Sequence, residues 1–124
     1  MANEFTVGGS ISVNVGRARS SVTRTGVRSD LSGTLASAAR TIGLTTAEQA
    51  LPMGDVSSPG WTWLQSLEAD GGSNIVWGVK PAGTFLPFGK LLPGEPALIR
   101  MAGVPVYAKS VGASADLYFW ISEQ

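Results

Sequence analysis

The chain has 124 residues, of which 44% are hydrophobic and only 15% are charged, and its nine basic and nine acidic side chains cancel. This length predicts one domain with a modest core. The balanced charge argues against partners recognised by bulk electrostatics, so we expect no nucleic acid and no membrane. Cysteine and histidine are both absent, which excludes disulfides, thiolate chemistry and the most common general base.

The N-terminal sequence MANEFTVGG shows no signal peptide, because it lacks a basic segment followed by an apolar run. No apolar run approaches the ~18 residues that a membrane-spanning helix requires. We therefore expect a protein that is made and used without classical secretion. A surface with so little charge is poorly protected against association, which favours an oligomer or a larger assembly.

The first predicted element is a strand over residues 5–15. From Phe5 to Val15 the odd-numbered positions are apolar, apart from Gly9, and the even-numbered positions are polar or glycine. This alternation is typical of a strand with one face in water, and the glycine pair at 8 and 9 indicates a bulge. Residues 17–29 are polar and predict a weak edge strand or an extended arm. Its arginines are Arg17, Arg19, Arg24 and Arg28.

The middle of the chain has a less regular pattern. A turn is predicted at residues 32–33. Residues 34–44 contain enough alanine for a helix, while β-branched residues near their end favour a strand, and both interpretations stay open. The sequence TTAE at 45–48 fits a capping box, which predicts one helical turn that ends at Pro52.

Residues 61–67 predict a strand with both of its tryptophans on one face. The strongest turn signal of the chain, DGGS, follows at 70–73. Residues 75–79 then predict the return strand of a β-hairpin, which would place Trp77 opposite the first strand.

The last third of the chain predicts a loop at 81–89 and then three strands. These strands are expected at 97–101, 104–109 and 116–122. The final strand is apolar on both faces, with Leu117, Phe119 and Ile121 on one and Tyr118 and Trp120 on the other. We expect the first face to lie in the core and the second to contact a neighbouring layer or subunit.

Short predicted strands, spaced by about ten residues and separated by glycine and proline, indicate an all-β fold. We predict a single β-sandwich or jelly-roll-like domain over residues 1–124, with about eight short antiparallel strands. Its N-terminal part is more extended and contains the arginines, so that residues 1–50 form in part an arm.

Without histidine or cysteine, catalysis would need paired carboxylates, a Ser/Lys pair or a carboxylate-bound metal. Most acidic residues stand beside glycine, proline or serine in predicted turns, and no pair is selected. The nine acidic residues of the chain are Glu4, Asp30, Glu48, Asp55, Glu68, Asp70, Glu95, Asp116 and Glu123. Residues 70–74 lack the alternating acids of a calcium loop. We expect no enzyme, no catalytic residue, no metal site and no cofactor, and a carboxylate hydrolase is the lowest-ranked alternative.

Four tryptophans are many for a chain of this length, and on strands they are more often core or interface anchors than sugar platforms. The arginines fit an edge strand or an interface with an acidic protein surface, and no interleaved aromatic residue supports stacking on bases. The predicted interface residues are Tyr118, Trp120, Trp61, Trp63, Trp77, Arg17, Arg19, Arg24 and Arg28.

The second half of the chain also carries a series of motifs. They read GDVSSPGWTWLQSLEADGGSNIVWGV, then FLPFGKLLPGEPALIRMAG, then VPVYAKSVGASADLYFWISEQ. This series resembles the small all-β virion structural proteins of tailed bacteriophages, of the capsid decoration or cement type. One departure is visible, because such proteins often read N-L-D where this chain has Ser66, Leu67 and Glu68.

The resemblance implies a virion protein that is made in the host cytoplasm and stabilises the assembled head. Its implied partners are the major capsid protein or other virion proteins, and the chain is expected to form a homo-oligomer, with a trimer as the working guess. Two alternatives stay open. One is a neck, tail or fibre component, and the other is a glycan-binding module that uses surface tryptophans.

Overall fold

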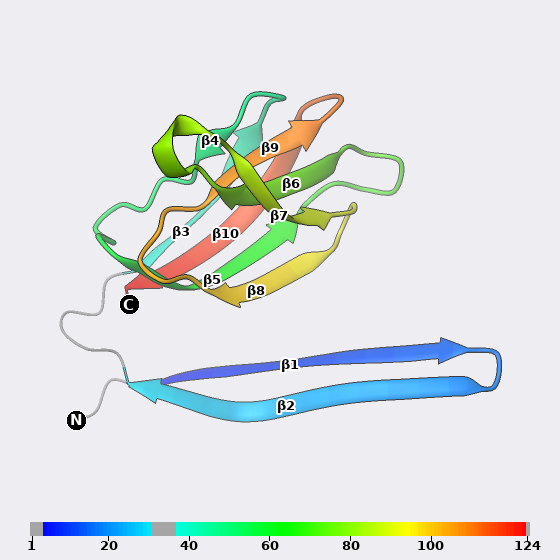
Figure 1. Cartoon of the computed structure of the whole chain (residues 1–124). Helices are drawn as coiled ribbons and strands as arrows, with labels where there is room; N and C mark the ends of the chain where they lie inside the picture. The colour runs from blue at the N-terminus through cyan, green and yellow to red at the C-terminus, as the bar shows by residue number, and fades with distance from the viewer. Residues whose placement is uncertain (1–3, 31–36, 124) are drawn as a thin grey trace. The chain divides into compact units, whose positions relative to one another are not determined.

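The computed structural model describes residues 4–30 and 37–123. In these ranges the chain is nearly all β, with a single 3-10 turn, η1 (Pro81–Gly83), and no α-helix. The chain divides into two compact units, Met1–Leu35 and Ala36–Gln124. Figure 1 draws the strands of both units.

The first unit is a β-hairpin of two long antiparallel strands, β1 (Glu4–Val15) and β2 (Ala18–Asp30). The strand predicted at 5–15 is therefore confirmed, and the segment at 17–29 adopts the strand alternative. Two residues connect the strands, and the first of them, Gly16, has a φ of 59°. Two-residue hairpin loops require positive φ, and a side chain disfavours it. Glycine, which has no side chain, therefore suits this position.

A β-bulge interrupts the hairpin at the level of the glycine pair at 8 and 9, where one was predicted, but the extra residue lies on the opposite strand, β2. The register pairs Val7 with Val27 and Gly9 with Arg24, so β2 supplies three steps where β1 supplies two. This extra residue shifts the phase of β2. As a result Val22 and Val27, which differ in parity, both pair with the apolar parity of β1, and the sequence of β2 shows no period of two.

The second unit is a β-sandwich of two four-stranded antiparallel sheets (Figure 1). One sheet has the strand order β3-β10-β5-β8 and the other has β4-β9-β6-β7. The strands are β3 (Ser37–Leu44), β4 (Gln49–Ala50), β5 (Pro59–Ser66), β6 (Asn74–Val79), β7 (Leu86–Leu91), β8 (Pro96–Arg100), β9 (Tyr107–Val111) and β10 (Ala115–Glu123).

The pairing of these strands is nested. The first pairs with the last (β3 with β10), the second with the seventh (β4 with β9), the third with the sixth (β5 with β8), and the two central strands pair with each other (β6 with β7). A long antiparallel ribbon rolled up in this way gives the strand order of an eight-stranded jelly roll. The predicted all-β sandwich is confirmed.

The core lies between the two sheets and is built by alternation. In β10 the side chains of Leu117, Phe119 and Ile121 are fully buried, as the period of two predicts. Leu64 of β5 and Ile75 of β6 are fully buried as well. Each such side chain stabilises the fold by about 1.5–3 kcal/mol relative to an exposed one.

The predicted hairpin between residues 61–67 and 75–79 is wrong. Both segments are strands, but β5 pairs with β10 and β8, whereas β6 pairs with β7 and β9. The turn at 70–73 therefore carries the chain from one sheet to the other. A turn signal marks a change of direction without specifying a partner, and the apolar inner faces of both strands are covered across the sandwich.

The predicted helical turn after residues 45–48 is also wrong. The Thr45 hydroxyl accepts hydrogen bonds from the Ala47 N–H and from Gln49 Nε2, both at 3.3 Å, and the chain then enters β4. Glu48 lies 3.3 Å from Lys80 Nζ and forms a salt bridge with it. A hydrogen bond from a backbone N–H to a nearby hydroxyl occurs both at helix caps and in turns, so it does not specify a helix. Here the pairing of β4 with β9 makes the following segment a strand.

The remaining predictions are met to different degrees. The strand alternative for 34–44 is found from residue 37 onward, while the turn at 32–33 lies outside the described residues. The predicted loop at 81–89 contains η1 and the first part of β7. The strand predicted at 104–109 begins only at Tyr107.

Candidate interaction surfaces

The sheet β3-β10-β5-β8 carries an aromatic strip on its outer face. Trp120 pairs with Trp63, and Tyr118 pairs with Gln65. Directly opposite residues share a face, and the alternate residues of both strands are buried in the core. Trp61, Trp63, Tyr118 and Trp120 therefore lie on the outer face, where all four are partly buried. We call these four residues the aromatic face.

Strand β8 extends the aromatic face toward the edge of the sheet. Leu98, which is 37% exposed, pairs with Trp63, and Arg100 pairs with Trp61. The Arg100 guanidinium lies 5.9 Å from the centroid of the Trp61 ring, within cation–π range. Tryptophan, tyrosine and arginine are the residue types enriched among interface anchors. The sequence reasoning missed Leu98 and Arg100, because only the β5–β8 register brings them beside the tryptophans.

Trp77 lies in the core and not on the aromatic face. It belongs to β6 of the other sheet and is 7% exposed. Its ring packs against Gly89 of β7, where an added Cβ would come within 2.6 Å of the ring. The structure therefore brings together Trp61, Trp63 and Trp120 and leaves Trp77 inside.

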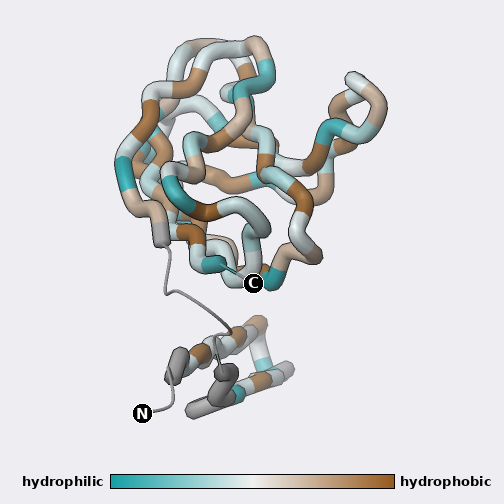
Figure 2. Tube along the Cα trace, turned by 90° about the vertical axis from the view of Figure 1, so that its left-hand side faces the viewer, coloured by the Kyte–Doolittle hydropathy of each residue, from teal (hydrophilic) through white to brown (hydrophobic). Residues whose placement is uncertain are grey.

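The hairpin presents an apolar face. Ile11, its partner Val22, and Val15 lie on this face, and they are exposed to 72%, 69% and 70%. Figure 2 shows hydrophobic positions recurring along these strands between paler ones. Arg24 pairs with Gly9, at a register position on the same face, and Gly9 lies between Val7 and Ile11. We define the hairpin face as Val7, Ile11, Val15, Val22 and Arg24.

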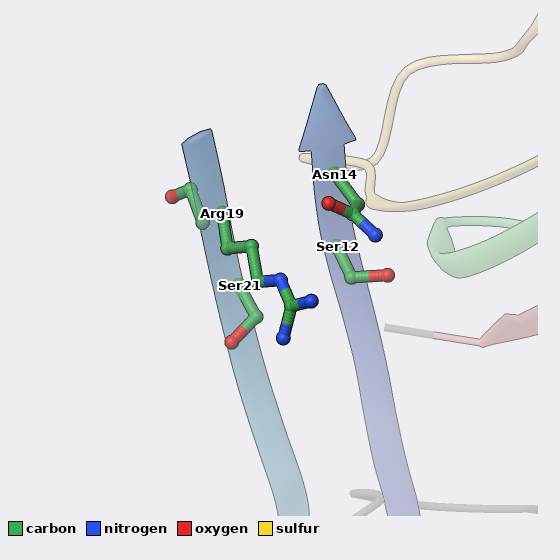
Figure 3. A pocket seen from close by; sticks show the side chains of 5 residues that line it. Ser12, Asn14, Arg19 and Ser21 are labelled. Atoms are coloured by element: carbon green, nitrogen blue, oxygen red, sulfur yellow. The ribbon is translucent and has the colours of Figure 1, made fainter. Parts of the chain in front are cut away.

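The opposite side of the hairpin is polar. Ser12 pairs with Ser21 and Asn14 pairs with Arg19, and these side chains line an open hollow (Figure 3). Hydroxyl, amide and guanidinium groups gather there, without a carboxylate among the lining side chains that the structure describes. The hollow is open to solvent, which suits a contact surface better than an enclosed ligand site.

The predicted arginine cluster is therefore distributed over the hairpin. Arg17 is exposed in the turn, Arg19 lies on the polar side, and Arg24 lies on the hairpin face. For Arg28 the backbone register is described, opposite Thr6, and its side chain lies outside the described residues.

Glu123 at the end of β10 fastens the segment that precedes β5. Its carboxylate accepts hydrogen bonds from the Ser57 hydroxyl at 2.9 Å, the Ser57 N–H at 2.9 Å and the Ser58 N–H at 3.0 Å. The bonds from Ser57, with that from Ser58, hold the pKa of Glu123 below its ordinary value. The carboxylate thus has a structural role at this position.

Two other carboxylates accept backbone hydrogen bonds, one from strand β10 and one within the turn between β7 and β8. Glu68 accepts a hydrogen bond from the Asp116 N–H at 2.7 Å, and Glu95 accepts one from the Leu92 N–H at 2.9 Å. Over residues 4–30 and 37–123, no group of three or more acidic side chains is placed to hold a metal ion. Nor does this part of the chain contain a helix long and apolar enough to cross a membrane.

Comparison with protein-family models gives no match, and comparison with curated protein sequences gives none either. The two surfaces, namely the aromatic face of the sandwich and the hairpin face, are therefore the structural basis for assigning a function.

Proposed function

We propose that this chain is a non-enzymatic virion structural protein that decorates and cements an assembled bacteriophage head. The observation that carries this proposal is the hairpin. Its strands of 12 and 13 residues hold apolar side chains that are about 70% exposed. A two-stranded hairpin is marginally stable in water by itself. A partner that covers the hairpin face would therefore stabilise it on binding.

The sandwich supports an assembly role in a different way. Its aromatic face offers partly exposed anchors on a regular sheet, and several of its carboxylates are engaged in hydrogen bonds that hold loops. Jelly rolls occur in viral capsid proteins and in lectins, and a fold alone does not specify a function. The proposal therefore rests on the surfaces, together with the sequence resemblance of residues 55–124.

The mechanism that follows is mass action. A protein that binds only the assembled shell stabilises that shell in proportion to its occupancy. The partner would be the major capsid protein, and a standard interface buries about 1,600 Å². A homo-oligomer, such as a trimer, would bind several shell subunits at once and gain avidity without new contacts.

Particles that lack this chain test the proposal. We expect them to release their contents at a lower temperature than complete particles, and we expect added purified protein to restore the higher temperature. The measurement is a thermal ramp with a dye that reports released nucleic acid. Identical release temperatures with and without the chain would contradict a cement role.

A further inference from the structure

We propose that the hairpin face docks on an acidic protein surface of the shell, with Arg24 as its central charged contact. This inference rests on the proposed function and adds the chemistry of the partner. The surface that it describes has an apolar strip and at least one carboxylate that meets Arg24.

Between residues 5 and 29 the charged side chains of the hairpin all have one sign. Residues 5–29 contain four arginines and no acidic residue. The two acidic residues of the hairpin, Glu4 and Asp30, are register partners at its open end, away from the turn. A surface that matches this element is therefore negative, because complementary charge guides association and selects the partner.

Arg24 makes this requirement specific. Its register partner is Gly9, which lies between Val7 and Ile11, and Val22 lies on the same face of β2. A surface that covers the valines also takes Arg24 out of water, and an unpaired buried charge is strongly unfavourable. A carboxylate satisfies the guanidinium in a bidentate geometry that also fixes orientation.

The same residue argues against a second copy of the hairpin as the occupant. Two hairpin faces stacked on each other would bury two Arg24 side chains. Neither hairpin offers an acid between residues 5 and 29 to pair with them. Such like-charge burial disfavours self-association through this face.

A nucleic acid is disfavoured by the placement of the arginines. Arg19 and Arg24 lie on opposite faces and Arg17 lies in the turn. The arginine side chains that the structure describes thus form no stripe along which a phosphate backbone would run. The valine and isoleucine neighbours of Arg24 also suit a protein surface better than a phosphate backbone.

The test compares Arg24→Glu with a matched control, Arg19→Glu, in the full chain. Both variants change the charge equally, and only the first lies on the hairpin face. We expect Arg24→Glu to weaken binding to purified shells that lack the chain by about tenfold or more, and Arg19→Glu to weaken it by less than about threefold. Binding is measured by co-sedimentation at one fixed salt concentration. Matching far-ultraviolet spectra establish that both variants keep their strands.

A photo-crosslinking residue placed at Val22 identifies the occupant directly. We expect it to capture a shell-protein peptide that contains aspartate or glutamate. Capture of a second copy, of the chain's own sandwich or of duplex DNA added as a competitor would overturn the inference. If the wild-type chain binds shells and both glutamate variants bind equally well, the inference fails while the proposed function stands. If the wild-type chain does not bind shells, both fail.

Discussion

Phe119 and Trp120 are neighbours in β10 and lie on opposite faces of one sheet. Phe119 is fully buried in the core, whereas Trp120 is partly exposed on the aromatic face, opposite Trp63. The period of two predicts this division from the sequence alone. The sequence could not show that Trp77 belongs to the core, because residues 75–79 are apolar or glycine at every position and a period of two does not identify their buried face.

Alanine substitutions at these two positions should have opposite consequences. Phe119→Ala removes a buried ring and leaves a cavity, so we expect the free energy of unfolding to fall by about 3–5 kcal/mol. Trp120→Ala should reduce stability less and should weaken binding to shells more. Urea denaturation and shell co-sedimentation measure the two effects. A larger loss of stability for Trp120→Ala than for Phe119→Ala would place Trp120 in the core.

Glu123 predicts a pH dependence whose sign follows from its hydrogen bonds. Its pKa in the folded state is lowered from the ordinary 4.5, so the folded state binds this proton more weakly than the unfolded state does. The stabilisation by Ser57 and Ser58 is therefore fully present above pH 4.5 and is lost as the pH falls through the lower folded-state pKa.

We expect Glu123→Gln to flatten the loss of stability below pH 4.5, because the substituted side chain no longer titrates. Thermal unfolding from pH 3 to pH 7, on the order of ten points, measures the effect. Asp70→Asn in the exposed turn is the control for the change in net charge. If Glu123→Gln loses stability below pH 4.5 as the unsubstituted chain does, the bonds from Ser57 and Ser58 to Glu123 do not contribute to stability.

At the scale of elements, the sequence predicted most strands but not their partners. Period-two patterns and turn residues are local, and they identify β1, β5, β6 and β10 well. Pairing is a long-range property, so the same signals gave a hairpin for β5 and β6 that does not form. The bulge in the N-terminal hairpin shows a related effect, because one inserted residue removes the simple alternation from β2.

Gly78 tests the observed pairing of β6 with β7. The register shifts between Trp77 and Gly78, and a Cβ at Gly78 would clash with the backbone of Leu86 and Pro87. Backbone atoms in a sheet cannot move aside as a flexible side chain can, so we expect Gly78→Ala to cost about 1–3 kcal/mol of stability.

Gly43→Ala in β3 is the matched control, since its added Cβ would meet Asp116 Oδ1 at an ordinary 3.7 Å and neither glycine has positive φ. We expect this substitution to change stability by less than about 0.5 kcal/mol. Urea denaturation midpoints compare the two variants. Equal destabilisation by both would contradict the close approach of β7 to Gly78.

At the scale of the whole molecule, the number and spacing of strands indicate a sandwich, but its nested pairing joins strands that are far apart in the sequence. The β3–β10 pair, for example, links residues 44 and 115. The aromatic face depends on a second long-range pairing, that of β5 with β10. The sequence therefore indicated most of the residues that form the surfaces, but it did not indicate which strands bring them together.

The central claim is that the chain decorates an assembled shell through the aromatic face of its sandwich and through the hairpin face. Cryo-electron microscopy of purified particles tests it most directly. We predict density that fits the eight-stranded sandwich at repeated positions on the outside of the head, with the hairpin lying on the shell protein. Density for the chain only at the neck, tail or fibres, or particles without the chain, would contradict the claim.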